Sequence, residues 1–109
     1  MTMIVAFCLW GNRIAPRYDH SQTVWIVTLE KGKLIHETTL VTEHLEPMIL
    51  CKTVAAHAVD TLICGGVLDP CRKILVRSGV TIIDNIIGSS RAVLQQFLTG
   101  MLLPGTVVD

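Results

Sequence analysis

Apolar residues fall into runs that predict strands in the first part of the chain. Residues 3–9 are continuously apolar, as in a central strand that is covered on both faces. Residues 23–30 and 34–40 are also strand-like, and Lys31-Gly32-Lys33 between them supplies the glycine that a tight hairpin requires. These three strands are predicted to form an antiparallel meander.

The rest of the chain alternates helical and strand patterns. Apolar residues after Pro47 recur every three or four positions, which is helical spacing, and proline is tolerated in the first turn of a helix. A serine before the last apolar stripe is a typical helix N-cap. The predicted helices are 47–59, 69–77 and Ser89 or Ser90 to Gly100, and the predicted strands are 61–64 and 80–84.

This order of elements predicts an α/β fold of one layered sheet. With right-handed crossovers, it gives a five-stranded mixed sheet in the order 3-2-1-4-5, flanked by three helices. Strands one, four and five then run parallel. Their carboxyl ends bring three loops to one edge, where open α/β sheets bind ligands: residues 11–22, Cys64-Gly65-Gly66 and Gly88-Ser89-Ser90. We expect the three loops to form one crevice.

Length and composition predict a single globular domain over residues 1–109. Half of the residues are hydrophobic and 17% are charged, which is typical of a compact chain. The tail, residues 103–109, carries no motif and is expected to be flexible. Nine basic and nine acidic residues give a net charge of zero, which disfavours nucleic acid as a ligand. The apolar residues 1–10 lack a basic leader and are too few to cross a bilayer, so we expect a cytoplasmic protein without a membrane partner.

Four cysteines have a spacing typical of neither a small disulfide framework nor a CxxC zinc site, so free thiols are expected. Cys71 falls near the start of a predicted helix, where free N–H groups favour the thiolate that binds metals. Cys64 on the adjoining turn is predicted to reach the same ion, and soft thiolates suit iron, copper or molybdenum–sulfur species. The alternative is that both are small buried hydrophobes. Core packing is the expected role of Cys8 and Cys51.

Several short motifs occur in a characteristic order along residues 3–102. They are Gly11-Asn12-Arg13, Ala15-Pro16-Arg17-Tyr18-Asp19-His20-Ser21, Leu62-Ile63-Cys64-Gly65-Gly66, Ser78-Gly79-Val80 and Phe97-Leu98-Thr99-Gly100-Met101-Leu102. In these motifs the chain resembles the dinitrogenase iron-molybdenum cofactor biosynthesis family, which is related to the nitrogenase cofactor carriers. The resemblance implies a ribonuclease H-like fold and a carrier of molybdenum- or iron-containing metal–sulfur clusters without established catalysis.

One loop departs from the family pattern. Family members usually read Ser-Pro-His-Phe-Gly-Arg-Ala where this chain has residues 15–21. Pro16 matches and Tyr18 stands for the aromatic residue, whereas Arg17 takes the place of the histidine and His20 that of the arginine. The histidine and the arginine of the family pattern have therefore exchanged positions in this chain.

The candidate site follows from the crevice and the resemblance together. A metal–sulfur cluster is an anion, so Arg17 is expected to pair with its charge, Tyr18 to pack on it, and His20 to act as a ligand or a cation. Ser89 and Ser90 at a helix start form a candidate anion site, although ordinary capping explains them equally well. The predicted binding residues are Gly11, Asn12, Arg17, Tyr18, His20, Gly65, Gly66, Ser89 and Ser90, and the predicted metal ligands are Cys64 and Cys71.

Three classes of function compete on this evidence. The leading interpretation is a non-enzymatic carrier or scaffold that takes a metal–sulfur cluster from a donor protein or passes it to an acceptor, with self-association left open. A metal-dependent nuclease is disfavoured because the first strand has no carboxylate, and it would require Asp19, Asp69 and Asp84 to gather at the crevice. The third class is a regulatory or interaction module that keeps the fold and binds no cluster.

Overall fold

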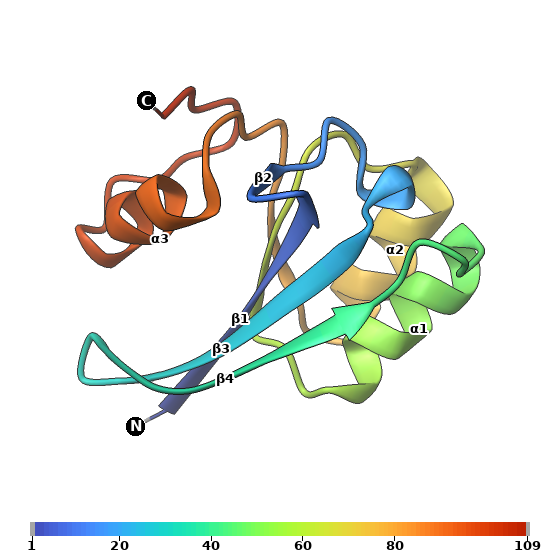
Figure 1. Ribbon diagram of the computed structural model, residues 1–109. Coiled ribbons are helices and arrows are strands. Elements are labelled where there is room, and N and C mark those ends of the chain that lie inside the picture. Colours follow the sequence, from blue (N-terminus) through green and yellow to red (C-terminus); the bar gives the residue numbers. More distant parts are fainter. Residues whose placement is uncertain (1, 109) are drawn as a thin grey trace.

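The computed structural model describes residues 2–108, which form three layers (Figure 1). A mixed β-sheet lies between helices α1 and α2 on one face and helix α3 on the other. The helices are α1 Pro47–Ala56, α2 Asp69–Arg77 and α3 Ser90–Leu98, and a 3-10 turn, η1, covers Tyr18–His20. The strands are β1 Thr2–Trp10, β2 Arg13–Ile14, β3 Thr23–Glu30, β4 Lys33–Val41, β5 Thr61–Ile63 and β6 Thr81–Ile83.

Five strands lie in the order β4-β3-β1-β5-β6, which is the predicted order. Strand β1 is antiparallel to β3 and parallel to β5, and β5 is parallel to β6. The sheet nevertheless has six strands instead of the predicted five. The additional strand, β2, pairs antiparallel with the end of β1 through Leu9 with Ile14 and Trp10 with Arg13. Gly11, with φ +63°, allows the tight turn between these two strands.

The continuous apolar run of β1 is explained by burial on both faces of the sheet. Ala6 and Cys8 pack in the core beneath α1 and α2, whereas Val5, Phe7 and Leu9 pack in the core beneath α3. Successive side chains of a strand point to opposite faces, so a strand covered on both sides has no polar position. The Phe7 ring lies 5.0 Å from that of Trp25.

The predicted helices are confirmed, with differences at their ends. Helix α1 stops at Ala56, before the predicted residue 59, and Ala58 has a positive φ of 55°. Helix α3 begins after Ser89, which accepts a hydrogen bond from the Ala92 N–H at 3.3 Å and is therefore the N-cap. None of the helices within residues 2–108 is long and apolar enough to cross a membrane.

The tail has specific contacts that the sequence does not predict. The Val108 N–H donates to the Ile87 carbonyl at 2.7 Å, and the Ile87 N–H donates to the Thr106 carbonyl at 3.1 Å. Val108 also packs on the core beneath α3. These contacts hold the tail against the loop at Ile87 and the core beneath α3, and Asp109 lies outside the described residues.

Candidate functional site

The three loops predicted to converge do so, and backbone hydrogen bonds join them. Tyr18 N–H donates to Gly66 O at 2.9 Å, and Gly66 N–H donates to Pro16 O at 2.8 Å. On the other side of the first loop, Ile14 N–H donates to Gly88 O at 2.9 Å and Ser90 N–H to Asn12 O at 2.8 Å. The first loop thus lies between the other two at the carboxyl ends of β1, β5 and β6.

Gly65, one of the predicted binding residues, is in close contact with the backbone of the first loop. A Cβ atom on Gly65 would lie 2.1 Å from Pro16 O and 2.2 Å from Ala15 O, far inside van der Waals contact. A Cβ on Gly66 would meet nothing closer than 3.8 Å. The bare backbone of the double-glycine turn is therefore covered at Gly65 by the first loop and not by a ligand.

Tyr18 is an internal anchor and not the surface aromatic expected to pack on a ligand. Its side chain is fully buried, and its hydroxyl donates to Pro47 O at 2.8 Å and is hydrogen-bonded to Cys71 Sγ. Burial, with the neighbouring thiol of Cys71, raises the pKa of Tyr18 well above its ordinary value. The tyrosine remains a neutral hydroxyl that fastens the first loop to α1 and α2.

Cys64 and Cys71 are in the core beneath α1 and α2, together with Cys8 and Cys51. Burial raises the pKa of Cys64 well above its ordinary value, and the neighbouring Cys8 and Asp84 raise it further. Within residues 2–108, no group of three His, Cys, Asp or Glu side chains is placed to hold a metal ion. The structure therefore does not bring Cys64 and Cys71 to the crevice surface as the predicted pair of ligands.

What the crevice does present to solvent is a hollow of about 280 Å³ lined by Trp10, Pro16, Arg17 and His20. Trp10 is 55% exposed at the end of β1, and the side chains of Arg17 and His20 are 49% and 63% exposed. The hollow combines an aromatic surface, a guanidinium and an imidazole, which suit an anion with a polarisable surface. Sequence reasoning missed Trp10, although a large aromatic residue directly before a long loop was a usable signal.

Asp19 holds Arg17 in place and lies beside His20. Arg17 donates to the two oxygens of Asp19 through Nε at 3.1 Å and Nη2 at 2.9 Å, and Nε2 of His20 lies 3.9 Å from Asp19 Oδ2. The Asp19 side chain is only 8% exposed. This carboxylate fixes the guanidinium by a two-point contact and offsets part of its positive charge.

The remaining predicted residues have backbone or capping roles. Ser89 caps α3, Ser90 is buried, and Asn12 supplies its carbonyl to the N–H of Ser90. Gly11 N–H donates to Gln22 Oε1 at 2.9 Å. The capping interpretation thus accounts for Ser89, and the backbones of Asn12 and Ser90 join two of the loops that form the crevice.

The carboxylates that a nuclease would need are not gathered. Asp84 forms an ion pair with Arg72, and Asp19 forms its pair with Arg17. No cluster of these two carboxylates with Asp69 occurs among the described residues. Two-metal phosphoryl chemistry requires carboxylates that share metal ions about 4 Å apart, so this geometry gives that function no support.

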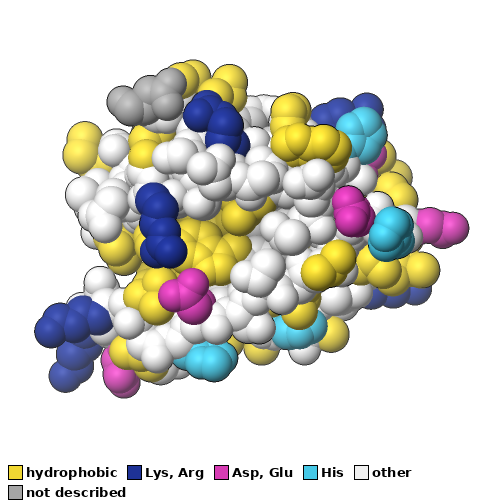
Figure 2. Space-filling model, in the orientation of Figure 1, with side chains coloured by type: hydrophobic (Ala, Val, Ile, Leu, Met, Phe, Trp, Pro, Cys, Tyr) yellow, Lys and Arg dark blue, Asp and Glu magenta, His cyan; other side chains and the backbone are white. Residues whose placement is uncertain are grey.

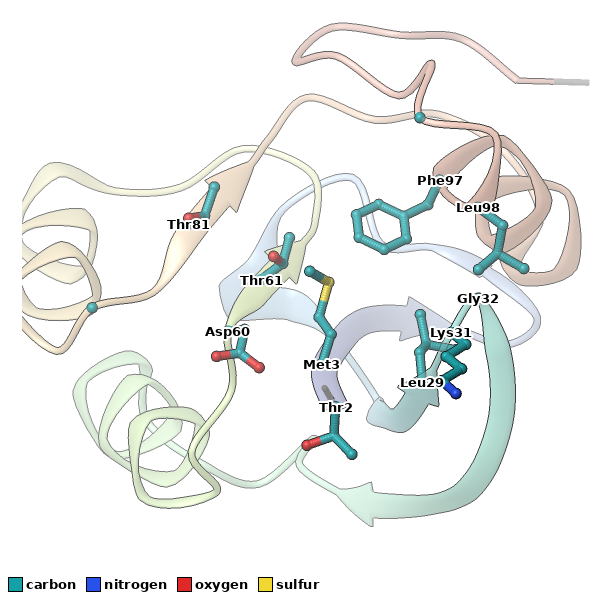
Figure 3. Close-up of a pocket in the computed structure, with 12 residues that line it drawn as sticks. Thr2, Met3, Leu29, Lys31, Gly32, Asp60, Thr61, Thr81, Phe97 and Leu98 are labelled. Carbon is teal, nitrogen blue, oxygen red and sulfur yellow. The ribbon is translucent and has the colours of Figure 1, made fainter.

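A second and larger hollow, of about 590 Å³, lies at the opposite end of the sheet. Figure 2 shows hydrophobic side chains gathered in a depression between α3 and the sheet. In Figure 3, Met3 from β1 and Phe97 from α3 extend toward the same space, with Asp60 at its side. Asp60 accepts a hydrogen bond from the Ile4 N–H at 2.8 Å, so its carboxylate is already used to hold β1.

Comparison with solved structures shows that this fold recurs. The crystal structure of PH0822 has a TM-score of 0.85 at 16% sequence identity and covers 92% of each chain. MJ0327 from Methanocaldococcus jannaschii has a TM-score of 0.78 at 16% identity, covering 94% of this chain and 93% of its own. The apo form of the orange protein from Desulfovibrio gigas has a TM-score of 0.76 at 15% identity, covering 98% and 96%.

Sequence comparison identifies the family of the chain. No curated protein matches the chain in sequence. The sequence profile of the family described as dinitrogenase iron-molybdenum cofactor matches residues 1–100, which is nearly the whole chain. The chain therefore belongs to the dinitrogenase iron-molybdenum cofactor family.

Proposed function

We propose that this protein is a carrier or scaffold that binds an anionic metal–sulfur cluster in the hollow formed by Trp10, Pro16, Arg17 and His20. The observation that carries the proposal is the composition of this hollow, which offers a guanidinium, an imidazole and an indole surface. The four thiols lie in the core instead. The cluster is held by charge, hydrogen bonds and dispersion, with no cysteine ligand.

The chemistry of a metal–sulfur cluster matches these side chains. Its bridging and terminal sulfides carry negative charge, which Arg17 meets with N–H donors and His20 with a ring N–H. Sulfide is also polarisable and gains dispersion energy against the flat face of Trp10. Family membership supports the same ligand class, because the family is described by an iron-molybdenum cofactor.

A carrier has to release what it binds, and this arrangement suits release. Non-covalent contacts at a half-exposed hollow break without the loss of a metal–protein bond. A donor or acceptor protein can approach the open side of the hollow, where Trp10 is 55% exposed. The proposal has three further parts. The fold is classified as ribonuclease H-like, the protein is located in the cytoplasm, and it does not catalyse a reaction.

Uptake of tetrathiomolybdate, a soluble molybdenum–sulfur anion, tests this proposal. Reduced protein is mixed anaerobically with the anion, desalted and analysed for molybdenum and for charge-transfer absorption. Arg17→Met is expected to lose most of the bound molybdenum, whereas the control Arg77→Met, an exposed arginine at the end of α2, retains it. Failure of the wild-type protein to retain any molybdenum would overturn the proposal.

One observation favours a second function. The guanidinium of Arg17 is already paired with Asp19, which suits an interaction module that keeps the fold and binds no cluster. The same uptake experiment separates the two functions, since such a module retains no molybdenum in the wild type or in either variant.

A further inference from the structure

Three sulfur-containing side chains lie together between α1 and α2, outside the hollow. Cys71 Sγ is 3.9 Å from Met48 Sδ, and Cys51 Sγ is 3.2 Å from the backbone carbonyl of Met48 one helical turn away. Cys51 and Cys71 are buried, whereas Met48 is 40% exposed. We call these residues the sulfur triad. The triad is closed on the core side and reaches solvent through Met48.

The distance between two sulfurs of the triad fits one small, soft metal ion. An ion held by three sulfurs at trigonal angles, each at about 2.3 Å, separates the sulfurs by about 4.0 Å. The Cys71–Met48 separation of 3.9 Å is that of two sulfurs on one such ion, and the Cys51 thiol is directed at the same turn of α1 as Met48. Thiolate and thioether ligands together select Cu(I), while zinc sites are usually completed by a fourth ligand.

The surroundings of the triad offset the negative charge that two thiolates would bring. Cys71 lies in the first turn of α2, where the helix dipole favours negative charge. The Tyr18 hydroxyl is hydrogen-bonded to Cys71 Sγ, and its single proton can turn from Pro47 O to a thiolate formed there. Without a metal, burial raises the pKa of Cys51, so the neutral thiol is the resting form.

We propose that Met48, Cys51 and Cys71 form a binding site for a single Cu(I) ion. As the ion binds, each thiol gives its proton to solvent and each sulfur forms one bond to copper. Copper enters and remains as Cu(I), so no electron is transferred. The site is separate from the hollow of Trp10 and Arg17, and it stands whether or not the protein carries a metal–sulfur cluster.

A competition titration tests the site. Fully reduced protein is titrated anaerobically with Cu(I) against a chromophoric Cu(I) chelator, and the copper-loaded protein is then studied by X-ray absorption. The expected result is one Cu(I) per chain with a sulfur-only shell of three atoms at about 2.3 Å. Release of protons on binding, measured in weak buffer, is expected to approach two per ion.

Variants assign the ligands. Cys51→Ser and Cys71→Ser are expected to lose tight binding, and Met48→Leu, which keeps the size of a half-exposed side chain, to weaken it about tenfold or more. Cys8→Ala is the matched control, because this buried thiol is in the same core but outside the triad. Binding that survives in both serine variants, or absence of binding in wild type and Cys8→Ala alike, would overturn the proposal.

Discussion

The hydroxyl of Tyr18 is hydrogen-bonded to Cys71 Sγ, which joins the first loop to the start of α2 across 53 positions of sequence. The same hydroxyl donates to Pro47 O at the start of α1. Tyr18 therefore fastens the loop that carries Arg17 and His20 onto both helices. The positions of Arg17 and His20 therefore depend on a side chain that is buried beneath them.

Removal of that hydroxyl is expected to loosen the loop. Tyr18→Phe keeps the buried ring and loses two hydrogen bonds, so the free energy of unfolding should fall by about 1–2 kcal/mol. Tyr18→Ala also removes the ring and should cost about 3–5 kcal/mol. Urea unfolding measures both values. Equal stability of wild type and Tyr18→Phe would show that the hydroxyl is not an anchor.

The double-glycine turn offers a matched pair of substitutions. Gly65→Ala places a methyl group 2.1 Å from Pro16 O and should reduce stability by about 2–3 kcal/mol as the loop is pushed away. Gly66→Ala meets nothing closer than 3.8 Å and is expected to change stability by less than about 1 kcal/mol. Thermal or urea unfolding distinguishes the two. Equal effects would argue against a steric role for Gly65.

Loss of the Asp19 charge is expected to strengthen anion binding. Asp19→Asn frees the charge of Arg17 from its carboxylate partner. The affinity for tetrathiomolybdate should rise by about two to five times, a small factor because Arg17 is half-exposed and solvent screens its charge. The gain should shrink at high salt. Titrations at two ionic strengths measure it, with Asp69→Asn in α2 as the control. Weaker binding by Asp19→Asn would mean that orientation of Arg17 matters more than its free charge.

Buried thiols predict a loss of stability in alkaline solution. Burial raises the pKa of Cys8 from 9.0 to about 12. Above pH 9 the unfolded chain loses this proton and the folded chain keeps it, so the free energy of unfolding should fall by up to about 1.4 kcal/mol per pH unit until pH 12. Denaturant unfolding from pH 7 to 10 checks this. In Cys8→Ala the slope should be shallower, and an unchanged slope would contradict the assignment.

The strand order could be predicted because it depends on local patterns. Apolar runs and the glycine of the hairpin predict the five longer strands, and crossover handedness orders them. Strand β2 could not be predicted, since two residues in a polar loop are too few to show the alternation of apolar and polar positions that marks a strand. Helix ends depend on single backbone angles such as φ at Ala58, which sequence periodicity does not report.

The sequence predicted where the candidate site lies but not which side chains face solvent there. An aromatic residue in a polar loop suggests a surface contact, and only the distant partners Pro47 and Cys71 show that Tyr18 is buried. A glycine permits close approach of either a ligand or another backbone, and only the distance to Pro16 O shows which applies at Gly65. Both the burial of Tyr18 and the close contact of Gly65 depend on residues far away in the sequence, which local sequence patterns do not reveal.

The most direct test of the central claim compares the hollow with the thiols. Molybdenum retained after anaerobic incubation with tetrathiomolybdate is measured for the double variants Trp10→Ala/Arg17→Met and Cys64→Ala/Cys71→Ala, with circular dichroism as the check that both are folded. Binding in the hollow predicts that the first variant loses molybdenum and the second retains it. Retention by the first variant and loss by the second would contradict it and place the ligand on cysteine.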